Sequence, residues 1–177
     1  MVWPGDRSGL FPTFERFSMF TKILLCTHGS AGAQKAEEYV FIHLLPKSPS
    51  AGLTVLTIVD KDWSTMSSDD WLNTSTTRTQ FKDYVDEQLA REIAEDWQRI
   101  KTTYPLAEQA KFIKVAGGIE ETIAEVAGKL ASELIVLGAF YKKPSRLFSV
   151  KMTPGLAATL SNEKLHPLLP CPLLTVP

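Results

Sequence analysis

The sequence predicts an α/β fold with a single doubly wound parallel sheet and helices on both faces of the sheet. Short, nearly continuous apolar runs such as Leu134–Gly138 are typical of strands that are covered on both faces. Between these runs lie longer segments whose apolar residues recur every three or four positions, as they do in amphipathic helices. Strands and helices alternate along the chain, and this order favours one parallel sheet with right-handed crossovers.

The first strand is expected at Lys22–Thr27, followed by a turn at Gly29 and a helix cap at Ser30. Apolar residues then recur at helical spacing: Ala33, Ala36, Val40 and Leu44. Pro46 ends this helical pattern. The second strand is expected at Leu53–Val59, where the chain is again almost continuously apolar.

Residues 60–77 are polar, and their composition predicts a long loop. Loops of this length are often functional, so the segment is either a lid or a surface segment whose Trp63 and Trp71 pack on the edge of the domain. A long amphipathic helix is expected over residues 81–104, because apolar residues recur there at helical spacing until Pro105.

The remaining elements complete the alternation. A third strand is expected at residues 110–115, and Gly117 and Gly118 then turn the chain into a helix over residues 119–130. The strand Leu134–Gly138 follows, and a short helix near residues 157–166 leads to a last strand at residues 172–176. Five strands are therefore expected.

Length, charge and cysteine content exclude several classes of protein. The chain has 177 residues and a formal net charge of -1, which fits one domain and gives no basic field for nonspecific nucleic-acid binding. No apolar run is long enough to span a membrane, so we expect a cytoplasmic protein. Cys26 and Cys171 lack metal-ligand spacing and are expected to be free thiols.

Residues 1–18 show no regular period and are interpreted as an N-terminal extension of a domain over residues 19–177.

Three segments together resemble the universal stress protein family. Residues 22–30, KILLCTHGS, are similar to its first strand and the turn that follows. Residues 118–138 resemble its third helix and fourth strand, and residues 171–176, CPLLTV, resemble its closing strand. The resemblance covers nearly all of residues 19–177. It implies the sheet order 3-2-1-4-5, and it implies a homodimer, which would form through the closing edge strand.

The resemblance also implies a ligand site where the first, second and fourth strands end. The candidate ligand-binding residues at these ends are Thr27, His28, Gly29, Ser30, Val59 and Gly138. In the nucleotide-binding members of the family, ATP lies at this edge of the sheet, where open α/β sheets bind their ligands. His28 either hydrogen-bonds such a ligand or faces solvent as a turn residue. Ser30 fits a helix cap better than a nucleophile.

The family's ATP signature, Gly-x2-Gly-x9-Gly-(Ser/Thr), is not intact in this chain. Its glycines let backbone N–H groups approach the phosphates. Gly138 matches the first glycine, but Tyr141 stands at the second position and Lys151 and Met152 at the last two. His28 also replaces the acidic residue that usually follows the first strand. ATP or AMP binding in the usual manner is therefore not expected.

A basic segment follows the fourth strand. Lys142, Lys143 and Arg146 either bind an anion in place of the glycines, dock an acidic partner, or are simply solvated. No nucleophile and base form a recognisable pair, so no catalytic or metal-binding residue is assigned.

These observations lead to three hypotheses of function. The first is a stress-related, dimeric binding or regulatory protein without the usual ATP site. The second is an adenine-nucleotide-binding protein or slow ATP hydrolase whose basic segment replaces the glycine-rich loop. The third is a protein that docks a partner through residues 60–77 or through the N-terminal extension.

Overall fold

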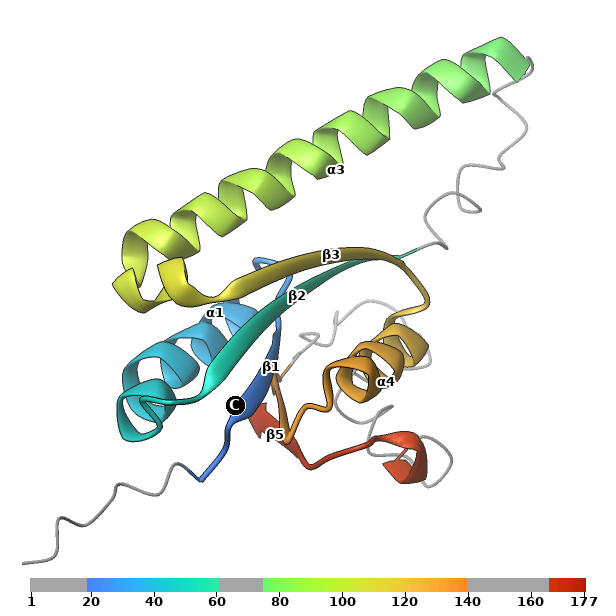
Figure 1. The fold of residues 1–177 in the computed structure, drawn as a ribbon. Helices are drawn as coiled ribbons and strands as arrows, with labels where there is room; N and C mark the ends of the chain where they lie inside the picture. The colour runs from blue at the N-terminus through green and yellow to red at the C-terminus, as the bar shows by residue number, and fades with distance from the viewer. Residues whose placement is uncertain (1–18, 61–74, 140–165) are drawn as a thin grey trace, which may run out of the picture.

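The computed structural model describes residues 19–60, 75–139 and 166–177. Five parallel strands form one sheet in the order β3-β2-β1-β4-β5 (Figure 1). The strands are β1 (Lys22–Cys26), β2 (Gly52–Asp60), β3 (Lys111–Gly117), β4 (Leu134–Gly138) and β5 (Leu173–Val176). The predicted fold class and strand order are confirmed.

Helices cover both faces of the sheet, as predicted. The α-helices are α1 (Ala31–Glu38), α3 (Ser75–Thr103) and α4 (Ile119–Leu130). The turn η1 (Tyr39–Leu44) is π-helical. The short 3₁₀ helices are η2 (Leu45–Lys47), η3 (Pro105–Gln109) and η4 (His166–Leu168). Because α1 and α3 lie on one face and α4 on the other, the sheet is the middle layer (Figure 1).

Side chains of β1 alternate between the two cores. Ile23 and Leu25 pack with Val40 and Ile100 below α1 and α3, whereas Leu24 packs on the face covered by α4. All three β1 residues are at most 1 % exposed. Their burial on both sides of a central strand explains why the strand is apolar without alternation.

Two helix boundaries were predicted wrongly, and the third strand, which was expected at residues 110–115, extends to Gly117. The predicted loop over residues 60–77 overlaps the helix α3, which begins at Ser75 rather than near Phe81. Serine and threonine are common in loops but also occur in the first turn of a helix, so composition alone misplaced this end. Residues 61–74 of that loop lie outside the described residues.

The other boundary lies in the first helix. It was predicted as one helix to Leu44, but it continues beyond Glu38 as the π-helical turn η1. The N–H of Leu45 donates to the carbonyl of Val40, five residues back, before the 3₁₀ turn containing Pro46. The predicted short helix over residues 157–166 lies outside the described residues except for His166. Within the described ranges, no helix has the length and apolar character needed to cross a membrane.

Candidate functional site

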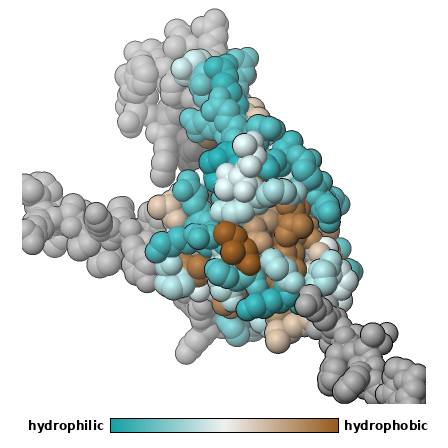
Figure 2. All heavy atoms as spheres, turned by 90° about the vertical axis from the view of Figure 1, so that its left-hand side faces the viewer, coloured by the Kyte–Doolittle hydropathy of each residue, from teal (hydrophilic) through white to brown (hydrophobic). Residues whose placement is uncertain are grey.

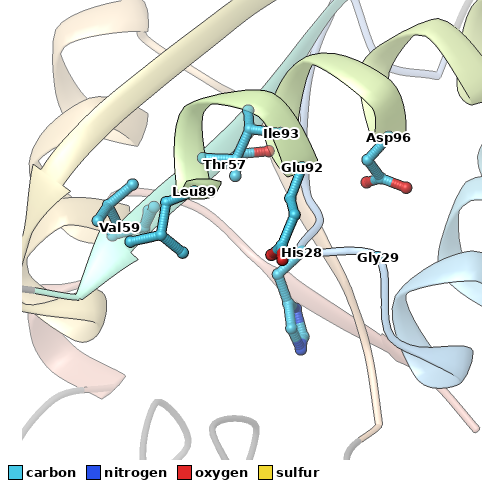
Figure 3. A pocket seen from close by; sticks show the side chains of 9 residues that line it. His28, Gly29, Thr57, Val59, Leu89, Glu92, Ile93 and Asp96 are labelled. Carbon is cyan, nitrogen blue, oxygen red and sulfur yellow. The ribbon is translucent and has the colours of Figure 1, made fainter. Parts of the chain in front are cut away.

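A pocket of about 440 Å³ opens where β1 and β2 end beneath α3 (Figure 3). Its lining comes from three elements: His28 and Gly29 after β1, Thr57, Ile58 and Val59 on β2, and Leu89, Glu92, Ile93 and Asp96 on α3. The structure therefore brings three of the predicted site residues together: His28, Gly29 and Val59. It adds a wall from α3 that the sequence analysis had treated only as an amphipathic helix.

The wall contributed by α3 has an apolar part and an acidic part. Leu89 and Ile93 are four residues apart, so they lie on one helical face, and Figure 3 shows them near Val59 and Thr57. Glu92 and Asp96 are also four residues apart, each three positions after one of the apolar pair, and both line the pocket. In Figure 3 the side chain of Glu92 extends from α3 toward the His28 end of the pocket.

The turn after β1 is held in one conformation by local contacts. Gly29 has a φ of 76°, which favours glycine. A side chain there would also meet the carboxylate of Asp96, whose atoms would lie 3.4 Å from the added Cβ. The Gln34 side chain donates to the carbonyl oxygen of Gly29 at 3.0 Å. Gly29 therefore fits the positive φ of this turn, which lies in contact with α3 at Asp96.

Ser30 caps helix α1, as predicted. Its Oγ accepts a hydrogen bond from the backbone N–H of Ala33 at 3.3 Å. A hydroxyl that satisfies the first turn of a helix has a structural role.

A buried polar network lies under the same turn. The Thr27 hydroxyl donates to the carboxylate of Glu37, whose side chain is fully buried. Arg99 of α3 donates to Glu37 at 2.8 Å and to Asp96 at 2.7 Å. Thr27 therefore lies behind the pocket as part of a network that joins β1, α1 and α3, rather than on the pocket's surface.

The network also sets the charge at the edge of the pocket. Desolvation opposes the charge on Arg99, but its hydrogen bonds to Glu37 and Asp96 outweigh this effect and raise the pKa of the guanidinium above its usual value. Arg99 thus stays cationic and partly offsets the charge of Asp96. Glu92, by contrast, is exposed at the pocket rim.

Glu37, Asp96 and Arg99 were missed as site residues. One signal was present for Glu37, which follows Ala33 by four positions and so falls on the apolar stripe of α1. A carboxylate on a buried stripe requires a cation or hydrogen-bond donors. The pairing partner, 62 positions further along the chain, could not be read from this pattern.

Gly138 lies at the end of β4, where it meets helix α1. A Cβ at Gly138 would overlap the backbone of Gly32, and a Cβ at Gly32 would overlap the carbonyl oxygen of Ala139. This contact gives Gly138 a packing role, while its role in binding a ligand stays a prediction. Lys142, Lys143 and Arg146 lie outside the described residues.

The described lining of the pocket has an acidic character. Its charged residues are Glu92 and Asp96, and none of the lining residues is lysine or arginine. Among the residues that the structure describes, no group of histidine, cysteine, aspartate and glutamate has the arrangement of a metal site.

The family is decided by a match to residues 19–150 of the sequence model for the Universal stress protein family. The chain belongs to the universal stress protein family. The family resemblance seen in the sequence is thereby confirmed, while the assignment to a branch without the ATP signature stays a prediction. No curated protein matches this universal stress protein.

Solved structures share the fold of this universal stress protein at low identity. The hypothetical protein MJ0577 is 20 % identical with a TM-score of 0.64, over 89 % of this chain and 96 % of its own. UspA from Lactobacillus plantarum is 18 % identical with a TM-score of 0.55, over 89 % and 97 %. A universal stress protein from Burkholderia pseudomallei is 20 % identical with a TM-score of 0.54, over 90 % and 98 %.

Proposed function

We propose that this universal stress protein is a regulatory binding protein that holds a small, ring-containing molecule in the pocket between the β1 turn and α3. The pocket itself supports the proposal most strongly. Its volume of about 440 Å³ falls within the range of roughly 300–1,000 Å³ that is usual for small-molecule sites. Ile58, Val59, Leu89 and Ile93 supply the apolar surface on which a flat ring would pack.

The charges of the pocket favour a neutral or cationic ligand over a polyphosphate. Glu92 places an exposed carboxylate at the rim, Asp96 adds a negative charge that Arg99 partly offsets, and like charges repel a phosphate chain. The sequence after β4 also lacks the glycines with which the family cradles phosphates. A nucleoside, with polar edges but no phosphate, matches this lining better than ATP does.

A direct test starts with the purified full-length chain. The protein would be denatured and the released small molecules identified by mass spectrometry, and the empty protein would then be titrated calorimetrically with adenosine, AMP and ATP. We expect adenosine to bind at least tenfold more tightly than ATP. Tighter binding of ATP than of adenosine would contradict the proposal. It would also be contradicted if none of the three titrations gave heat and denaturation released no small molecule.

Two variants locate the binding site. Ile93→Trp fills the apolar part of the pocket and is expected to abolish adenosine binding, whereas Leu168→Trp changes an exposed leucine that does not line the pocket and serves as the control. Glu92→Gln is expected to bring the affinities for AMP and adenosine closer together, because it removes one repelling charge. Equal binding by the Ile93→Trp variant and the unchanged protein would place the ligand elsewhere.

An adenine-nucleotide-binding function is the second candidate. It is favoured by the order of the sheet, since β4 pairs with β1 and so ends at the same edge as the pocket, and the basic segment follows β4 in the sequence. In that case Lys142, Lys143 and Arg146 would bind the phosphates. Their combined replacement by alanine would then weaken ATP binding far more than adenosine binding.

Assembly as a homodimer through β5 is part of the proposal. Leu173–Val176 is an edge strand, and exposed edges are usually paired or covered. The carbonyls of Pro172 and Val176 accept hydrogen bonds from the N–H groups of Ile135 and Ala139, so the N–H of Thr175 points away from β4. Thr175→Pro removes this outward donor and is expected to convert a dimer into a monomer by analytical ultracentrifugation. A parent chain that is monomeric at every concentration would contradict the proposal.

A further inference from the structure

A second hollow lies at the opposite end of the sheet from the ligand pocket. It has a volume of about 450 Å³ and a mostly apolar lining of Phe41, Ile42, Tyr104, Pro105 and Leu106, to which Glu38 and Thr103 add polar groups. Phe41 and Ile42 belong to η1, which precedes β2 in the chain. Tyr104, Pro105 and Leu106 follow the end of α3 and precede β3. We call this hollow the apolar groove. Figure 2 shows hydrophobic surface gathered on this side of the molecule.

The groove exposes large side chains above a packed floor. Ile42 is 50 % exposed and Leu106 is 42 % exposed, whereas Phe41 beneath them is buried. The ring of Phe41 stacks on that of Tyr104, with centroids 4.8 Å apart, so the two rings pack together in the floor of the groove. An apolar surface of this kind on a folded domain usually marks a site that something covers.

The apolar surface continues toward the point where the chain enters the sheet. A smaller hollow of about 150 Å³ also contains Leu106, and it extends over Leu45, Pro46 and Ala51. Beside Ala51, the N–H of Gly52 donates to the carbonyl of Thr21 at 2.8 Å. The segment that precedes Thr21 therefore begins at the end of this apolar surface.

We propose that residues 1–18 of the same chain lie in the apolar groove and cover it. Phe20 is partly buried against the hydrophobic cluster that contains Phe41 and Leu45, so the chain just before Thr21 already lies on the side of the sheet where the groove is. The family match begins at residue 19. The docking segment is thus an addition to the family's shared unit.

Residues 1–18 have the length and the chemistry for this role. At about 3.3 Å per residue an extended segment of this size reaches roughly 60 Å, which is more than enough to follow the groove. The segment contains four aromatic residues, Trp3, Phe11, Phe14 and Phe17, and its four charged residues cancel. Aromatic side chains gain most from burial in an apolar groove.

Photocrosslinking of the full-length chain tests this placement. Benzoylphenylalanine would replace Phe14, and the crosslinked residues would be mapped by mass spectrometry in an equal mixture of ¹⁴N-labelled and ¹⁵N-labelled chains. We expect crosslinks to residues 38–46 and 103–110 within chains of a single label. Crosslinks that join the two labels would assign the groove to a second copy, and crosslinks elsewhere or none at all would also overturn the proposal.

A pair of matched variants shows whether the groove itself attracts the segment. Leu106→Glu places a charge in the groove and is expected to lower the crosslink yield at least fivefold. Leu168→Glu changes another exposed leucine, 65 % exposed on η4, and should leave the yield unchanged. Circular dichroism would establish that both variants fold. Equal yields in the two folded variants would overturn the proposal.

Discussion

Gly32 of α1 and Gly138 of β4 pack backbone against backbone. A Cβ on Gly138 would overlap the carbonyl oxygen of Gly32, and a Cβ on Gly32 would overlap the carbonyl of Ala139. The two glycines thus let the first turn of α1 lie directly on the end of β4. Gly138 is also the residue that matches the first glycine of the family's ATP signature. Its presence is explained by packing even if no phosphate binds.

We predict that Gly138→Ala destabilises the protein in the absence of any ligand. The backbone of Gly32 belongs to a helix that is itself packed on the sheet and cannot move aside cheaply. Overpacking of this kind costs about 1–3 kcal/mol, and we expect the upper part of that range. The measurement is the free energy of unfolding in urea, made on protein shown by mass spectrometry to carry no small molecule.

Gly128→Ala provides the control for this prediction. Gly128 lies in α4, and nothing lies within 4 Å of a Cβ added there. Alanine favours a helix over glycine by about 0.5–1 kcal/mol, so this variant should be slightly more stable than the parent. If both alanine variants shifted stability in the same direction, the packing role of Gly138 would be refuted.

The fold was predictable from the sequence because its strands are central and buried on both faces. The runs at Ile23–Cys26 and Leu134–Gly138 are apolar for that reason, and their limits agree with β1 and β4 to within a residue. The strand order came from the family resemblance. Boundaries were less predictable where polar residues begin a helix, as they do at Ser75.

The site was predictable only where it follows a strand end. His28, Gly29 and Val59 line the pocket because parallel strands bring their carboxyl ends to one edge. The contribution of α3 depends on how that helix lies across the sheet, and its amphipathic pattern does not specify which residues meet β2. The pairing of Glu37 with Arg99 is likewise a tertiary contact without a local pattern.

Removal of Arg99 is predicted to destabilise the fold through Glu37. In the Arg99→Met variant, the fully buried carboxylate of Glu37 still accepts the hydrogen bond from the Thr27 hydroxyl, but it no longer has the ion pair with the guanidinium. Loss of one partner from a fully buried pair costs about 3–5 kcal/mol. Because the Arg99 side chain is 35 % exposed, we expect a smaller loss of about 2 kcal/mol, measured by urea unfolding.

A double variant separates the unpaired charge from lost packing. Adding Glu37→Leu to Arg99→Met removes the carboxylate as well, and we expect it to recover at least half of the lost stability. Lys129→Met breaks the exposed pair with Glu125 and serves as the control, with an expected change of under about 0.5 kcal/mol. No recovery in the double variant would show that Arg99 acts through packing alone.

Glu133 is predicted to make stability depend on pH in the acid range. Hydrogen bonds from the backbone N–H and the hydroxyl of Thr21 lower the pKa of this carboxyl below its ordinary value of 4.5. A carboxyl whose pKa is lowered by folding contributes its full stabilisation when the pH is above its ordinary pKa. This stabilisation is lost as the pH falls through the lowered pKa that the group has in the folded protein. Glu133→Gln should therefore reduce the acid dependence of the unfolding midpoint between pH 7 and pH 3. An unchanged pH profile would contradict the prediction.

The two free cysteines are predicted to differ strongly in reactivity. Burial raises the pKa of the Cys26 thiol to about 12. Since the thiolate is the nucleophile, only about one molecule in ten thousand carries a reactive Cys26 at pH 8. Burial also raises the pKa of Cys171, but this residue is only partly buried. Iodoacetamide should therefore alkylate Cys171 much faster than Cys26 in the folded protein, as followed by peptide mass spectrometry. In guanidinium chloride both should react at similar rates, and equal rates in the folded protein would show that β1 opens to solvent on the timescale of the labelling.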